Sequence, residues 1–258
     1  MQAPIRSGFT PPALDQGLCH IWWARPEDAT GTLLGLLDEQ EQLRYGSYRE
    51  QRDRDRFLVG SGLMRLILGH QLQQPPASVT LLRDCTICGR PHGKPRLPPG
   101  LPSIQLSVSH GGDRIAVALA HDAALGIDVE PVDAGLPVDE LAPHVLMPDE
   151  ASELERWSGM RRVEALLRYW TRKEAVVKAT GKGLAIPLRS FAVTGPADPP
   201  EVITWPLGRG KEISLHDLHP GVGHVASLAV LGPPLEVMEL DGTWLLELVG
   251  GGADSGKW

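Results

Sequence analysis

The sequence predicts an α+β protein made of two similar αβ subdomains. Two observations lead to this prediction: strand-like runs precede and follow two long helical stretches, and short features recur in both halves of the 258 residues. The recurring features are an Asp-Glu pair (38–39 and 149–150), a leucine (43 and 154) and a glycine that ends each long helix (69 and 181), at offsets of 111 or 112 residues. They indicate two copies of one αβ unit. The alternative is that helices rich in Glu, Leu and Arg align by chance.

The first half is predicted to contain a strand, two helical stretches and a hairpin. Residues 20–24 are a strand candidate, followed by a helical stretch with the first Asp-Glu pair and a long helix over about 52–69. Apolar runs at 104–108 and 115–120 flank a Gly-rich turn at 109–113, which is typical of a hairpin.

The second half repeats this order. Its opening strand covers 126–130, its long helix covers about 163–181, and strand-like runs separated by Pro- and Gly-rich turns follow at 191–194, 213–215 and 225–230. The sequence therefore predicts an N-terminal repeat at 1–122, a C-terminal repeat at 123–234 and a partly flexible extension at 235–258, which ends in a Gly-rich run.

Composition narrows the class of protein. The formal net charge of −7 argues against nonspecific binding to nucleic acid or to an anionic membrane through overall charge. The first residues have no apolar core of signal-peptide length, and no run approaches the roughly 18 apolar residues of a membrane span. We therefore expect a cytoplasmic protein.

The phrase GIDVE (126–130) has the pattern of a metal-binding strand. Apolar and acidic residues alternate, so Asp128 and Glu130 would lie on one face and Ile127 and Val129 on the other. Carboxylates of this kind hold Mg²⁺, which completes its coordination with waters and substrate phosphates.

A third carboxylate, Glu174, falls on the predicted inward stripe of the second long helix. Apolar residues at 163, 166, 167 and 170 define that stripe, and Glu174 and Lys178 continue it. Buried charges need partners, and a metal and a phosphate would suit these two. The alternative is a solvent-exposed i, i+4 pair, which stabilises a helix by only about 0.2–0.5 kcal/mol.

These phrases together resemble a known family. GIDVE combined with WTRKEAVVKATGKGL (170–184) is similar to the signature of 4′-phosphopantetheinyl transferases, specifically the surfactin-type branch with two pseudo-repeats in one chain. Supporting matches are GKP (93–95), LSVSH (106–110), which is similar to the family's N-x-S-H-S turn, and the first long helix from 56 to 65. The resemblance spans roughly residues 40–195.

The resemblance implies a reaction and a metal site. Phosphopantetheine would pass from coenzyme A to a serine of an acyl or peptidyl carrier protein, with release of adenosine 3′,5′-bisphosphate. Asp128, Glu130 and Glu174 would bind Mg²⁺, and Glu174 and Lys178 would be catalytic residues. Glu174 would remove the serine proton directly or through a metal-bound water, and the water route is easier because a metal-bound carboxylate is a weak base.

By the same resemblance, five residues would contact coenzyme A: Arg56, Lys94, Ser109, His110 and Lys178. Arg56 lies in an alternating-charge run that would otherwise be solvated surface, and a histidine in a hairpin turn is otherwise most often a surface residue. Gly111 replaces the family's second serine.

The first repeat lacks the acidic residues. At corresponding places we assign Trp22 and Ala24 to the positions of Asp128 and Glu130, and Gly62 to that of Glu174. One active site between the halves of a monomer follows.

The segment Cys85 to His92 has C-x₂-C-x₃-H spacing, which is a fragment of a zinc site. A structural zinc ion needs a fourth ligand, which Cys19 or His20 could supply through space. The favoured interpretation is a reduced turn that positions Lys94.

Carrier proteins of this class are typically acidic, so the candidates for docking them are the arginines at 161, 162, 168 and 172. Ordinary solvated helix charges are the alternative. Two rival functions remain open at this point: a Mg²⁺-dependent phosphohydrolase of a nucleotide or coenzyme, and a noncatalytic carrier-binding module.

Overall fold

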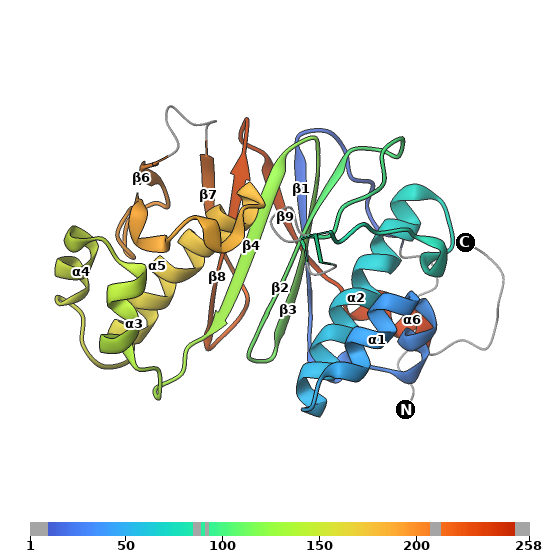
Figure 1. Ribbon diagram of the computed structural model, residues 1–258, viewed down its shortest axis with the longest axis horizontal. Coiled ribbons are helices and arrows are strands. Elements are labelled where there is room, and N and C mark those ends of the chain that lie inside the picture. Colours follow the sequence, from blue (N-terminus) through green and yellow to red (C-terminus); the bar gives the residue numbers. More distant parts are fainter. Residues whose placement is uncertain (1–9, 85–88, 91–92, 207–212, 251–258) are drawn as a thin grey trace.

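The computed structural model describes residues 10–84, 89–90, 93–206 and 213–250. Its elements form four layers, with two β-sheets in the middle and a group of helices on each outer side (Figure 1). The α+β class predicted from the sequence is therefore confirmed.

The first half contains the sheet that lies beside the helices near the N-terminus. Strands β1 (Leu18–Ala24), β2 (Ile104–Gly111) and β3 (Arg114–His121) pair antiparallel, with β3 between the other two. Helices α1 (Glu39–Ser47) and α2 (Gln51–Leu72) accompany this sheet. Short 3₁₀ turns occur at Pro26–Asp28, Gly31–Leu36 and Pro76–Ser78.

The second half also runs from a strand through helices to further strands, with an additional helix and a small strand pair. Strands β4 (Ala124–Pro131), β7 (Ile213–Leu218) and β8 (His224–Leu231) form an antiparallel sheet with β8 in the middle. The accompanying elements are α3 (Val138–Val145), α4 (Pro148–Leu154), α5 (Gly159–Thr180), 3₁₀ turns at Gly183–Ala185 and Leu188–Ser190, and the small pair β5 (Ala192–Val193) and β6 (Val202–Thr204).

The chain after residue 235 differs from the loose extension that the sequence predicts. Strand β9 (Glu236–Asp241) joins the first sheet in parallel beside β1, and α6 (Thr243–Gly250) buries Leu245 and Leu246 in the first half. The two paired strands are more than 200 residues apart in the sequence, and such a parallel pairing leaves no local sequence signal. The sequence therefore predicts a loose extension where the structure has a strand. Residues 251–258 lie outside the described residues.

Each long helix contains a buried ion pair at the same place, and the two pairs give a different sequence offset between the halves from the one that the sequence predicts. Arg65 is the fifteenth residue of α2 and Lys173 is the fifteenth residue of α5; both are fully buried. Arg65 binds Glu41 and Lys173 binds Glu150, and each glutamate is the third residue of a short helix that begins with a capping box. This correspondence supports the predicted duplication, at an offset of 108 or 109.

The corrected offset changes two assignments made from the sequence. Gly69 does not end α2, because the helix continues to Leu72 and is capped by the left-handed Gln73 (φ 52°), as Gly181 (φ 69°) caps α5. Glu174 then corresponds to Leu66 rather than to Gly62. The first half still has no carboxylate at that place.

The two sheets pack face to face through a third core of small side chains. This core contains alanines of β3 and β8, which let the sheets approach closely, together with apolar residues of β1 and β4. On their outer faces the sheets pack against α2 and α5. None of the described helices is long and apolar enough to span a bilayer.

At their edges the sheets meet along β2 and β4, where serine side chains replace a backbone ladder. The Ile127 amide donates to Ser107 Oγ (3.1 Å), and the Val129 amide donates to Ser109 Oγ (3.4 Å). A Cβ at Gly111 would collide with the carbonyl oxygen of Val129, so only glycine permits this approach.

Helix α5 crosses β4 at Gly126, where a Cβ would collide with the carbonyl of Ala175 and the amide of Ala179. We therefore predict that Gly126→Ala lowers the free energy of unfolding by about 1–3 kcal/mol, as overpacking of a core does. Gly46→Ala is the matched control, because Gly46 lies in α1 with open space around it and the change should be neutral or stabilising. Urea unfolding measures both. Equal effects of the two substitutions would contradict the close packing of α5 on β4.

Candidate functional site

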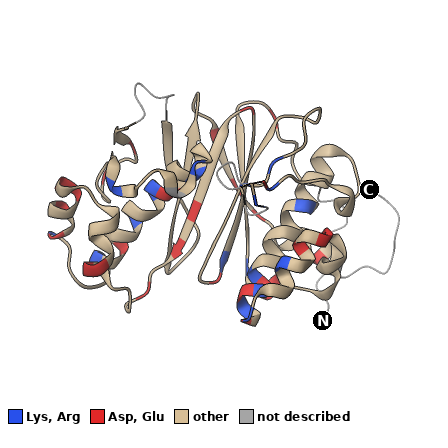
Figure 2. Cartoon of the chain, in the orientation of Figure 1, with Lys and Arg blue, Asp and Glu red and all other residues tan. Residues whose placement is uncertain are grey.

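Strand β4 presents its acidic residues toward α5, in the alternation that the sequence predicts. Ile127 and Val129 are fully buried in the core between the sheets, whereas Asp128 and Glu130 lie on the other face. Asp128 is 3% exposed and Glu130 is half-buried. Figure 2 shows this acidic part of β4 near the middle of the molecule.

The Asp128 carboxylate is the centre of a small polar network. Its Oδ1 accepts hydrogen bonds from Lys178 Nζ (2.5 Å) and from Ser109 Oγ (3.1 Å). Lys178 Nζ also lies 3.0 Å from Ser109 Oγ. The second oxygen, Oδ2, is buried and has no hydrogen-bond partner among the described residues. Because buried polar atoms are normally satisfied, this oxygen is available for a cation.

Glu130 and Glu174 share the electrostatic environment of Asp128. Burial and the charge of Asp128 raise the pKa of Glu130 to about 7. The same two causes, in the same order, raise the pKa of Glu174. Glu174 is half-buried, at the edge of the inward face of α5 rather than within it.

The donor set fits Mg²⁺, because it consists of carboxylate oxygens, one of them buried and unpaired, and because their mutual repulsion would be relieved by a divalent cation. Within the described part of the chain, no three His, Cys, Asp or Glu side chains are already grouped as a metal site.

The residues expected to contact coenzyme A lie around this network in different ways. Ser109 is part of it, and His110 follows on β2 with an exposed side chain. Surrounding protein, then the charges of Arg56 and Lys178, lower the pKa of His110. Arg56 donates two hydrogen bonds to the Gly112 carbonyl (3.0 and 2.6 Å). These contacts bring Arg56 to the hairpin turn.

Lys94 makes a contact that the sequence did not predict. Its Nζ donates to the Leu125 carbonyl (2.6 Å) and lies 3.4 Å from the Lys178 carbonyl. Burial lowers the pKa of Lys94 to about 8. Lys94 therefore links the loop before β2 to the start of β4 and the end of α5.

Two neighbours of Glu174 have structural roles that the sequence analysis missed. Lys173 Nζ is fully buried and donates to Glu150 (2.5 Å) and to the carbonyls of Val145 (2.9 Å) and Phe191 (2.8 Å). It thereby holds the segments before α4 and after α5 against the helix. The available signal was the capping-box glutamate at the start of α4.

Arg172 is fully buried and binds both carboxylate oxygens of Asp217. The expectation that it docks a carrier protein is therefore wrong, because its guanidinium does not reach the surface.

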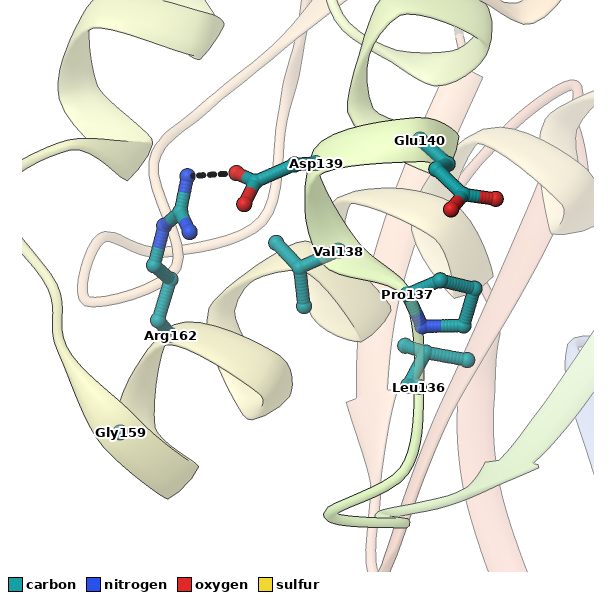
Figure 3. Close-up of a pocket in the computed structure, with 7 residues that line it drawn as sticks. All are labelled: Leu136, Pro137, Val138, Asp139, Glu140, Gly159 and Arg162. Carbon is teal, nitrogen blue, oxygen red and sulfur yellow. Dashed lines mark hydrogen bonds and ion pairs between the residues drawn. The ribbon is translucent and has the colours of Figure 1, made fainter.

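A cavity of about 390 Å³ lies on α3 and the first turn of α5 (Figure 3). Arg162 lines it and binds Asp139 at 2.7 Å, so this docking candidate already has an acidic partner. A second cavity, of about 470 Å³, lies at the ends of β1 and β9.

Cys85, Cys88 and His92, whose spacing is that of a fragment of a zinc site, lie outside the described residues, so the favoured interpretation as a reduced turn stays a prediction. Cys19, the proposed fourth ligand, is buried between the sheets, and burial raises its pKa to about 12. Its thiol is therefore protonated at neutral pH. His20, the other proposed ligand, is also buried.

Comparison with protein-family models assigns the chain to a family. A model described as "4'-phosphopantetheinyl transferase superfamily" matches residues 124–229, and one described as "4'-phosphopantetheinyl transferase, N-terminal" matches residues 22–122. The chain belongs to the 4′-phosphopantetheinyl transferase superfamily, and it is accordingly a transferase enzyme.

Within this superfamily the chain is Sfp-like. The 4′-phosphopantetheinyl transferase HetI of Nostoc sp. is 29% identical over 216 residues, which cover 83% of this chain and 87% of the relative. The 4′-phosphopantetheinyl transferase Sfp of Bacillus subtilis is 26% identical over 176 residues, which cover 67% and 74%. A solved holo-(acyl-carrier-protein) synthase from Bacillus anthracis, in complex with CoA (3',5'-ADP), has 21% identity and a TM-score of 0.37, covering 42% of this chain and 94% of that one.

We predict that Lys173→Met lowers the free energy of unfolding by about 3–5 kcal/mol, because it leaves the buried Glu150 carboxylate without its cation. The double variant with Glu150→Gln should lose less, since no unpaired charge is left behind. Arg162→Met is the control: its partner Asp139 is 83% exposed, and the expected loss is below about 1 kcal/mol. Urea unfolding measures these losses. If Lys173→Met and Arg162→Met lost similar amounts of unfolding free energy, the Lys173–Glu150 pair would not behave as a buried pair.

The pKa of Glu130 generates a prediction about pH. Folding raises the pKa of Glu130 from 4.5 to about 7, so the folded protein favours the protonated side chain. The resulting contribution of Glu130 to the free energy of unfolding is complete below pH about 4.5 and is lost as pH rises through about 7. Glu130→Gln imitates the protonated form and does not titrate.

In metal-free protein we therefore expect Glu130→Gln to gain about 1–2 kcal/mol of stability relative to wild type between about pH 5 and pH 8, a figure reduced for partial exposure. Urea unfolding with a chelator measures it. Glu140→Gln, at an exposed position on α3, should show no such gain. A constant difference between Glu130→Gln and wild type at both pH values would contradict the prediction.

Proposed function

We propose that this transferase moves 4′-phosphopantetheine from coenzyme A to a serine of an acyl or peptidyl carrier protein, in a Mg²⁺-dependent reaction that releases adenosine 3′,5′-bisphosphate. The observation that carries the proposal is the buried, half-satisfied carboxylate of Asp128, which lies beside Lys178 and Ser109 where the two halves meet. Membership of the superfamily supports the same reaction.

In this proposal Asp128, Glu130 and Glu174 hold the metal, while the first half, residues 1–122, supplies coenzyme contacts to a site on residues 123–234. When bound, Mg²⁺ neutralises charge on the pyrophosphate oxygens and favours departure of the leaving phosphate. The unpaired Asp128 Oδ2 and the raised pKa of Glu130 are the properties that favour a cation here.

The cationic side chains bind the coenzyme phosphates. Lys178 supplies a point charge beside Asp128, and Arg56 presents a planar guanidinium at the hairpin turn. Ser109 and His110 add donors from β2, the edge strand of the first sheet that lies beside β4. Lys94 orients the Leu125 and Lys178 carbonyls and so supports the phosphate site from behind.

Glu174 is the proposed acceptor of the serine proton. Its half-buried position at the edge of α5 leaves it open to an incoming hydroxyl, and a carboxylate within reach of a serine can accept its proton. Transfer through a bound water achieves the same result when the carboxylate is itself a metal ligand.

The carrier protein is expected to be acidic, and the docking candidates that keep exposed or half-buried guanidinium groups are Arg161, Arg162 and Arg168. We propose that the enzyme acts as a cytoplasmic monomer and serves the synthesis of secondary metabolites, as the two-repeat arrangement suggests.

The proposal is tested by incubating the protein with coenzyme A, MgCl₂ and a panel of apo carrier proteins. Intact mass spectrometry should show one added phosphopantetheine group on at least one carrier, at its serine, and the reaction should stop with a chelator. Glu174→Gln should retain coenzyme binding and slow the transfer by about 10²–10⁴-fold.

Glu164→Gln, at an exposed position on the same helix, is the matched control and should transfer at the wild-type rate. Modification of no carrier would refute the transfer reaction. Cleavage of coenzyme A without any carrier would favour a phosphohydrolase, and full turnover by Glu174→Gln would refute its role as base.

A further inference from the structure

Lys178 already occupies the carboxylate that the proposed metal needs. Its Nζ lies 2.5 Å from Asp128 Oδ1 and 3.0 Å from Ser109 Oγ, while Ser109 donates to the same Asp128 oxygen. One oxygen of the carboxylate is thus already paired with the ammonium group of Lys178. The other oxygen, Oδ2, is left buried and unpaired among the described residues.

Lys178 is well placed to leave this position. Its side chain is 32% exposed, whereas that of Asp128 is 5% exposed, so the ammonium lies at the entrance and the carboxylate behind it. The backbone of Lys178 stays fixed, because Lys94 binds its carbonyl and the helix is capped at Gly181. Only the flexible four-carbon stem needs to move.

A divalent cation and an ammonium group repel each other and compete for the same carboxylate. A metal ion on the unpaired Oδ2 would share this carboxylate with the ammonium on Oδ1, so metal binding favours movement of the Lys178 ammonium, and a displaced, partly desolvated ammonium needs a new anion. A phosphate group of the coenzyme is such an anion, and it would also suit a Mg²⁺ ion held by the carboxylates.

We propose that Lys178 acts as an internal cation that blocks Asp128 until a phosphate group accepts its ammonium, so that the protein takes up its metal together with the coenzyme, as a metal–coenzyme complex. This inference rests on the proposed function, because it takes coenzyme A as the phosphate ligand. No bond is made or broken: Lys178 exchanges one anionic partner for another. By linkage, the coenzyme raises metal affinity by the same factor as the metal raises coenzyme affinity.

The experiment is calorimetric titration of MgCl₂ into wild type, Lys178→Met and Lys182→Met, with and without saturating coenzyme A. Lys182 is exposed just after the C-terminal cap of α5, and its replacement by methionine removes the same charge. Without coenzyme, Lys178→Met should bind Mg²⁺ at least about tenfold more tightly than wild type, and Lys182→Met should differ by less than about twofold. With coenzyme this advantage should disappear.

If Lys178 only repelled the metal through its charge, Lys178→Met would bind Mg²⁺ more tightly than wild type to the same extent with and without coenzyme. A difference that disappears with coenzyme therefore indicates competition for the carboxylate. Lys178→Gln provides a second variant that keeps a polar group, and circular dichroism verifies that both variants are folded. Equal enhancement of metal affinity by coenzyme in wild type and Lys178→Met would overturn the inference while leaving the transfer reaction intact. If wild type did not bind coenzyme A, both the inference and the proposed function would fail.

Discussion

Two serine hydroxyls on β2 determine how the halves of this protein meet. The amides of Ile127 and Val129 point out of the edge of the second sheet and would be unsatisfied, because β2 does not form a backbone ladder with β4. Ser107 and Ser109 accept these bonds with their side chains. The strands can therefore lie side by side while each stays in its own sheet, and the outer face of β4 remains free for charged groups.

Helix α5 packs on this face of β4 and places its functional side chains beside the strand carboxylates. Gly126 lets the helix approach β4, so Glu174 and Lys178, one turn apart on α5, reach the strand carboxylates. The neighbouring residues Arg172 and Lys173 stabilise the fold, because both are buried and bind carboxylates and carbonyls. A helix so tightly held on both sides presents its functional groups with little freedom, which is what a preorganised site requires.

Local periodicity was enough to predict the acidic face, and it failed where burial is decided at long range. The alternation around Asp128 and the long helices follow from neighbouring residues alone, whereas β9 depends on a partner strand over 200 residues away. Arg172 looks like a surface residue in a polar phrase, but Asp217, 45 residues away, and backbone carbonyls between residues 194 and 198 bind its buried guanidinium. The sequence predicts a helix end at Gly69 because glycine is common at helix ends, but α2 continues for three more residues to Leu72.

The difference between the halves has a physical cause. In the first half, β1 has a backbone-paired strand on each side, and Trp22, on the face of β1 toward α2, is fully buried against Trp244 of α6. A carboxylate there would lie in an apolar core without a cation or solvent, which is costly. Strand β4 has β8 on one side only, and its other edge faces a strand that contributes Ser109 to Asp128. A carboxylate on this face of the strand is therefore tolerated in β4, where Ser109 of the first half and Lys178 of α5 provide its partners.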